Sequence, residues 1–109
     1  MIRYTTPTHT LIVGGVDLTD CDVYVSYRQV KGSSKNANSA DIDDPTVAYD
    51  GTDSVITVPL TQLQTGGFTP GRAQVQVNWI TSSGIRRATE IATINVTDNL
   101  LQEVIEYGA

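Results

Sequence analysis

The sequence has one histidine and one cysteine, His9 and Cys21, as candidates for a catalytic base or nucleophile. His9 stands in a β-rich stretch without a carboxylate motif to orient it, and a single histidine without partners does not define a catalytic site. Cys21 lies between Asp20 and Asp22, whose negative charges disfavour a reactive thiolate. We therefore expect His9 to be a solvent-facing strand residue and Cys21 to be a small residue of a turn or strand. A lone cysteine also excludes an internal disulfide and a multi-cysteine zinc site.

Two groups of aspartates have the oxygen ligands that calcium prefers. The groups are Asp17, Asp20 and Asp22, followed by Asp41, Asp43, Asp44, Asp50 and Asp53. Neither group has the spacing of an EF-hand loop, which needs a glycine at its sixth position and a glutamate at its twelfth. Aspartate is also common in turns, where its carboxylate accepts bonds from nearby backbone. We expect these residues to lie in solvated turns, with calcium binding as the alternative.

The aromatic residues have two possible roles, a carbohydrate-binding platform or packing in the core. The candidates are Trp79, Tyr24, Tyr27, Tyr49 and Phe68. Core packing is the expected role, because Trp79 shares its strand face with Val75 and Val77. The sequence contains no glycine-rich phosphate loop, Ser/His/Asp set or catalytic carboxylate pair. We therefore expect a protein that is not an enzyme and that needs no metal or other cofactor.

Size and composition indicate one soluble domain covering residues 1–109. Apolar residues make up 39% of the chain and charged residues 17%, which is typical of a chain that folds. The net charge of −5 disfavours nucleic acid as a partner, because such binding depends on lysine and arginine neutralising phosphates. A membrane is not expected as a partner either, because no segment approaches the ~18 consecutive apolar residues that span a bilayer.

Alternating apolar and polar residues predict strands rather than helices. Val75, Val77 and Trp79 lie on one face of the clearest strand, and the Gly14-Gly15 pair is typical of a tight turn. The predicted strands cover residues 8–13, 22–28, 46–49, 54–58, 73–80 and 86–96, with a further short segment at residues 16–19. These elements, without a βαβ rhythm, predict an all-β fold, an antiparallel two-sheet Ig-like β-sandwich of about seven strands.

Four segments do not fit simple alternation. Residues 31–44 are polar and predict an exposed, mobile loop or the tip of a long hairpin. Residues 60–65 precede a glycine-rich turn and predict one helical turn or an irregular connection. Ile91 falls on the wrong face of the 86–96 strand, which indicates a bulge or a strand covered on both sides. In the terminal segment 99–109 the apolar spacing favours a short helix, capped by Thr97 or Asp98, slightly over a last strand.

Three stretches of the sequence resemble small tail or baseplate structural proteins of phages and prophages of Gram-positive bacteria. The stretches are residues 10–19 with 23–29, residues 58–65, and residues 75–79 onward through 89–91 to 99–105. The chain is also similar to the N-terminal Ig-like domain of upper baseplate proteins, which anchors those proteins to the particle. The resemblance implies a virion subunit or adaptor, made in the bacterial host cytoplasm, that packs in many copies against itself and other virion subunits. A head decoration or connector protein and a carbohydrate-binding host-adhesion module are the alternatives.

Two groups of residues are candidates for contacts with partners. In general, an amphipathic terminal segment can pack its apolar side on a neighbouring subunit. The exposed edge of a sheet can also pair with a strand of a neighbouring subunit. The terminal candidates are Leu100, Leu101, Val104, Ile105 and Tyr107. Arg86 and Arg87 form a small basic patch, whose expected role is either solubility or pairing with an acidic neighbouring subunit.

Overall fold

The computed structural model describes residues 1–31, 34–43 and 45–108. This part of the chain contains strands and one short helix, and no helix in it is long and apolar enough to cross a membrane. The elements in chain order are β1 (Thr8–Gly14), β2 (Asp22–Lys31), β3 (Ser34–Asp43), β4 (Thr46–Tyr49), β5 (Asp53–Pro59), α1 (Gln62–Gly66), β6 (Gly71–Ile80), β7 (Arg86–Ala88) and β8 (Ala92–Val96).

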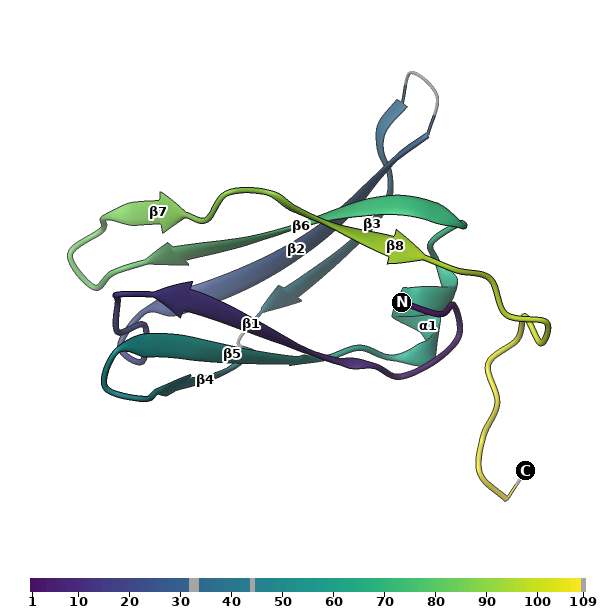
Figure 1. Cartoon of the computed structure of the whole chain (residues 1–109), viewed down its shortest axis with the longest axis horizontal. Helices are drawn as coiled ribbons and strands as arrows, with labels where there is room; N and C mark the ends of the chain where they lie inside the picture. The colour runs from purple at the N-terminus through teal and green to yellow at the C-terminus, as the bar shows by residue number, and fades with distance from the viewer. Residues whose placement is uncertain (32–33, 44, 109) are drawn as a thin grey trace.

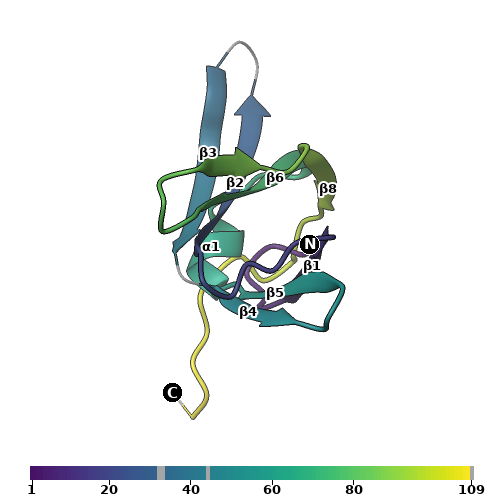
Figure 2. The ribbon, with the colours of Figure 1, turned by 90° about the vertical axis from the view of Figure 1, so that its left-hand side faces the viewer.

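The strands form two antiparallel sheets that pack face to face. The three-stranded sheet has the order β1-β5-β4, and the five-stranded sheet has the order β3-β2-β6, with β7 and β8 both paired to the other side of β6. The two layers are visible in Figure 2, with β3, β2, β6 and β8 above and β1, β5 and β4 below. This arrangement confirms the predicted all-β, antiparallel two-sheet sandwich, with eight strands in the described part of the chain where the sequence indicated about seven.

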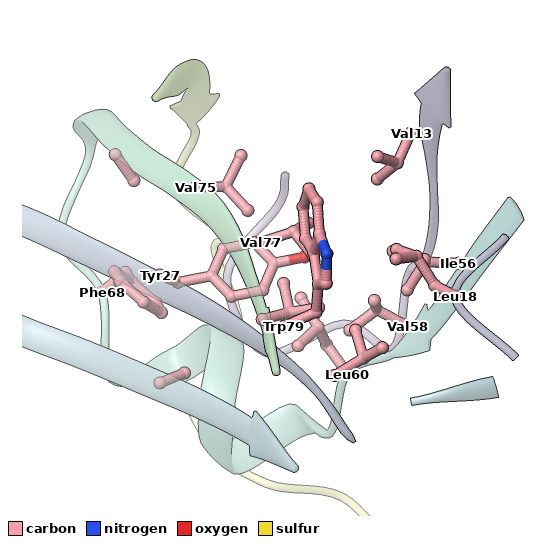
Figure 3. Close-up of a cluster of buried hydrophobic side chains, with 14 of the residues drawn as sticks. Val13, Leu18, Tyr27, Ile56, Val58, Leu60, Phe68, Val75, Val77 and Trp79 are labelled. Atoms are coloured by element: carbon pink, nitrogen blue, oxygen red, sulfur yellow. The ribbon is translucent and has the colours of Figure 1, made fainter. Parts of the chain in front are cut away.

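Alternation along β6 and β5 produces the core between the sheets. Val75, Val77 and Trp79 of β6 are buried, as are Ile56 and Val58 of β5. Residues from the connections complete the cluster, which Figure 3 shows in close-up, including Leu18, Leu60 and Phe68. Because burying one such side chain contributes ~1.5–3 kcal/mol, this cluster is the main source of the stability of the sandwich.

A buried hydroxyl ties the β1–β2 connection to β5. Ser54 is fully buried, and its Oγ accepts a hydrogen bond from the Leu18 amide at 2.9 Å and donates one to the Val16 carbonyl at 2.7 Å. Ser54→Ala leaves these two groups without their partner, so we expect the free energy of unfolding to fall by about 2 kcal/mol in urea titrations. Ser82→Ala, at an exposed position, is the control and should leave stability unchanged. Equal stability of the two variants would contradict the role given to Ser54.

Residues 34–43 form a strand, β3, that is the second arm of a long hairpin with β2, where the sequence predicted an exposed, mobile loop or the tip of such a hairpin. β3 runs antiparallel to β2, with Tyr27 opposite Ala40 and Arg28 opposite Ser39. Ala40 is buried, and Arg28 forms an ion pair with Asp41 at 2.8 Å. Backbone pairing thus organises a segment with little apolar surface to bury. Residues 32, 33 and 44 lie outside the described residues.

The predicted single strand over residues 86–96 is two strands, β7 and β8, separated by a bulge. Ala88 is opposite Asn78 and Ala92 is opposite Val75, so three residues of the returning chain face two residues of β6. Thr89 stabilises the bulge, because its amide donates to the Val77 carbonyl at 2.9 Å and its Oγ1 accepts from the Val77 amide at 3.1 Å. The extra residue places Ile91 at the surface, so the predicted bulge is confirmed.

The connection between β5 and β6 contains the predicted helical turn, α1. Thr61 and Gln64 form a capping box, in which the Thr61 Oγ1 accepts from the Gln64 amide and the Gln64 Oε1 accepts from the Thr61 amide. These reciprocal bonds satisfy two amides that a helix start otherwise leaves unpaired. α1 lies at the end of the sandwich where β8 ends, opposite the end that carries β7 (Figure 1).

Residues 98–108, called the C-terminal arm below, form neither the favoured helix nor a strand. The arm leaves the sandwich after β8 and runs past α1 as an irregular, extended segment (Figure 1). A helix this short is unfavourable in water unless its apolar side packs on something. Here the apolar side chains of the arm remain exposed, so the packing that such a helix needs is missing within one chain.

Candidate functional site

His9 faces the interior of the sandwich, which corrects the expectation of a solvent-facing residue. It is half-buried on β1, and its Nδ1 lies 2.7 Å from the Tyr27 Oη on β2. Burial, and to a smaller extent the positive N-terminus, lowers the pKa of His9, and burial raises the pKa of Tyr27 to about 12. The pair therefore joins the two sheets by a hydrogen bond between neutral groups.

The lowered pKa of His9 gives stability a pH dependence. The unfolded chain takes up a proton near the ordinary value of 6.5, whereas the folded chain does so only at lower pH. The stability that neutral His9 contributes is therefore complete above about pH 6.5 and is lost as the pH falls towards the pKa of the folded state. We expect the melting temperature to decline between about pH 7.5 and 5, and His9→Gln to remove most of this decline. An unchanged decline in the variant would contradict the assignment.

Three of the aspartates accept hydrogen bonds that stabilise turns. Asp17 accepts bonds from the amide and hydroxyl of Thr19, Asp50 accepts from the amides of Thr52 and Asp53, and Asp53 accepts from the Gly15 amide. These bonds lower the pKa of Asp17 and Asp50. Within the described residues, no three His, Cys, Asp or Glu side chains gather as a metal site; Asp44 and the side chain of Asp43 lie outside them. Cys21 is half-buried at the turn before β2 and packs against the core.

The five aromatic candidates do not form a platform. Trp79, Tyr27 and Phe68 are buried, which confirms core packing for these three. Tyr24 and Tyr49 are exposed but belong to different sheets, since Tyr24 is on β2 and Tyr49 on β4. A shared carbohydrate surface built from the whole set is therefore wrong for this fold.

The C-terminal arm presents its apolar side chains to solvent. Leu100 and Tyr107 are fully exposed, and Leu101, Val104 and Ile105 are each about half exposed, at 49–56% of their full area. Contiguous exposed apolar surface on a soluble domain is typical of an interaction site. Five of the seven partner-contact candidates are thus exposed on the arm, whereas the other two, Arg86 and Arg87, lie on β7.

Polar bonds hold the arm in this exposed position. Asp98 pairs with Arg3 at 2.9 Å, and the Asn99 side chain donates to the Arg3 carbonyl at 3.2 Å. Further along, the Gln62 side chain donates to the Ile105 carbonyl at 2.7 Å and accepts from the Ile105 amide at 2.8 Å. Arg3 and Gln62 were not among the candidates from the sequence, because no sequence motif links them to Asn99 and Ile105, which lie 96 and 43 positions away.

The basic patch of the sequence lies far from the arm. Arg86 and Arg87 are exposed on β7, at the opposite end of the sandwich from α1 and the arm (Figure 1). Arg86 also borders a shallow groove of about 310 Å³ on the outer face of the five-stranded sheet, lined by Tyr24, Ser26, Asn78, Trp79, Ile80 and Arg86. Alternation along β2 predicts from the sequence that Tyr24 points outward. The sequence does not predict the strand register that brings Tyr24 and Arg86 to the same groove.

Comparisons with protein-family models, with curated proteins and with solved structures find no match for this chain. The fold and the surfaces described above are therefore the basis for a function.

Proposed function

We propose that this protein is a structural component of a tailed phage or prophage particle, most specifically a tail or baseplate subunit or adaptor. It acts through protein–protein contacts and without catalysis. The observation that supports this proposal most directly is the C-terminal arm, in which Leu100, Leu101, Val104, Ile105 and Tyr107 are exposed together. The location in the virion is supported by the sequence resemblance to tail and baseplate proteins.

Energetics favour a subunit contact as the role of the arm. Burying a leucine, valine or isoleucine side chain contributes ~1.5–3 kcal/mol, so several together provide a large part of a stable interface. Because Gln62 fixes the Ile105 backbone beside α1, the arm loses little conformational entropy when a neighbour covers it. The packed sandwich is then the rigid part of the subunit, and the arm makes the contact with the neighbouring subunit.

The proposal is tested by particle composition. Particles released from the host bacterium are purified on a density gradient, and the protein is quantified by mass spectrometry against the major capsid protein. We expect several copies per particle, and antibody labelling in electron micrographs should mark the tail or baseplate. Labelling of the head would favour the decoration or connector alternative, and absence from intact particles would contradict a structural role.

A further inference from the structure

Positive charge is concentrated on one sheet of an otherwise acidic protein. Six of the seven lysines and arginines lie in strands of the five-stranded sheet, whereas β1, β4 and β5 carry none. The six are Arg28, Lys31, Lys35, Arg72, Arg86 and Arg87. The strands of the same sheet contain three aspartates, so this layer is net positive while the whole chain carries −5.

Some of this positive charge is available to a partner. Among the described residues, ion pairs join Arg3 to Asp98 and Arg28 to Asp41, and neither Arg72, Arg86 nor Arg87 belongs to one. Arg86 borders the groove that contains Tyr24 and Ile80, and its Nη2 donates to the Asn78 Oδ1 at 3.2 Å. The lining of the groove therefore combines apolar and aromatic residues, the polar residues Ser26 and Asn78, and one cation, Arg86.

The C-terminal arm has the complementary composition. Residues 98–108 contain Asp98, Glu103 and Glu106 and no lysine or arginine. Asp98 is paired with Arg3, which leaves the two glutamates interspersed with the exposed apolar side chains. An acidic, apolar segment matches a basic, apolar groove in both charge and hydrophobicity.

The arm does not reach the groove of its own chain. The Gln62 bonds hold Ile105 beside α1, and the groove lies at the β7 end of a molecule that is 45 Å along its longest axis (Figure 1). The three residues 106–108 that follow span at most ~11 Å even when fully extended. The matching surfaces are thus positioned to meet between two copies.

We propose that the C-terminal arm of one copy binds the groove lined by Tyr24, Ile80 and Arg86 on a second copy, with Glu106 facing Arg86. The inference rests on the proposed structural role and names the partner as another copy of this chain. Because the arm and the groove are different surfaces, the contact is head-to-tail, and its repetition produces a closed ring or an open helical array.

Charge reversal in the full-length protein tests this contact. The association constant is measured by sedimentation velocity at low and high salt. We expect Arg86→Glu or Glu106→Arg alone to lower it by roughly tenfold, and the chain carrying both changes to associate again. Arg87→Glu is the matched control, since it makes the same charge change outside the groove. Equal loss in the Arg87 and Arg86 variants, or no recovery in the double variant, would overturn the pairing.

A disulfide experiment locates the contact. In a Cys21→Ser background, copies with Gly108→Cys are mixed with copies with Ser26→Cys, a groove residue, or with Ala48→Cys on the other sheet as the control. We expect oxidation to link the first mixture several-fold faster than the control. Equal rates, or a chain that stays monomeric at all concentrations, would overturn self-assembly through the groove. The virion role would then still stand if the chain is present in purified particles, because a different subunit would receive the arm.

Discussion

Removal of residues 99–109 is expected to abolish incorporation into particles while the sandwich stays folded. The core residues lie before position 97, and the deletion removes the exposed bonds between Ile105 and Gln62 and one partly buried bond from Asn99 to Arg3. Without the arm, the five exposed apolar side chains that we assign to the subunit contact are absent. We therefore expect a large loss of assembly for a small loss of stability.

The deletion is measured by competition. Tagged full-length and truncated chains are co-expressed during particle formation, and their ratio is determined in the purified particles. Circular dichroism and the melting temperature of the truncated chain establish that it is folded. A full-length variant with Leu100, Val104 and Tyr107 changed to serine is the control for length, and it should also be excluded. Incorporation of the truncated chain at the full-length level would contradict the assembly role of the arm.

Trp79→Ala is expected to have the largest effect on stability. Trp79 lies in the middle of the core and is only 8% exposed, so truncation removes its packing and leaves a cavity. Such changes cost about 3–5 kcal/mol, which is a large part of the ~5–15 kcal/mol that keeps a small domain folded. We expect the urea midpoint to fall sharply, or the variant to be unfolded at 37 °C.

A matched truncation on the surface separates packing from a general loss of hydrophobicity. Ile91→Ala changes a side chain that the β7–β8 bulge exposes, and we expect a change within about 0.5 kcal/mol. If Trp79→Ala were as mild as Ile91→Ala, the interior between the two sheets would not be the source of stability.

Alternation carried most of the information about the fold. The period of two in β2 and β6 predicted which residues are buried, including Tyr27 and Trp79, with Tyr24 on the opposite face. The Gly14-Gly15 pair predicted the end of β1. These features are local, because a side chain points to one face of its strand or the other according to its position alone.

The errors concern interactions between distant residues. β3 is polar, and its strand character comes from pairing with β2 rather than from its own composition. His9 was expected at the surface because nothing near it in sequence indicates Tyr27, which is 18 residues away. The arm has helical spacing, but its apolar side chains remain about half to fully exposed, so the described residues do not provide the packing that a helix there would need. The groove is formed by residues that the registers of β2, β6 and β7 bring together, and the sequence alone does not predict these registers.

Hydrogen exchange in the free chain and in purified particles tests most directly whether this is a rigid sandwich that assembles through its arm. We expect the amides of residues 98–108, which lie at the surface, to exchange faster in the free chain than in particles, with the Ile105 amide the slowest of them in the free chain because it donates to the Gln62 side chain. The amides of Val75 and Val77 should exchange slowly in both states. Equal and rapid exchange of the arm in both states would contradict an assembly contact there, and new protection confined to the strands of the core would place the contact elsewhere.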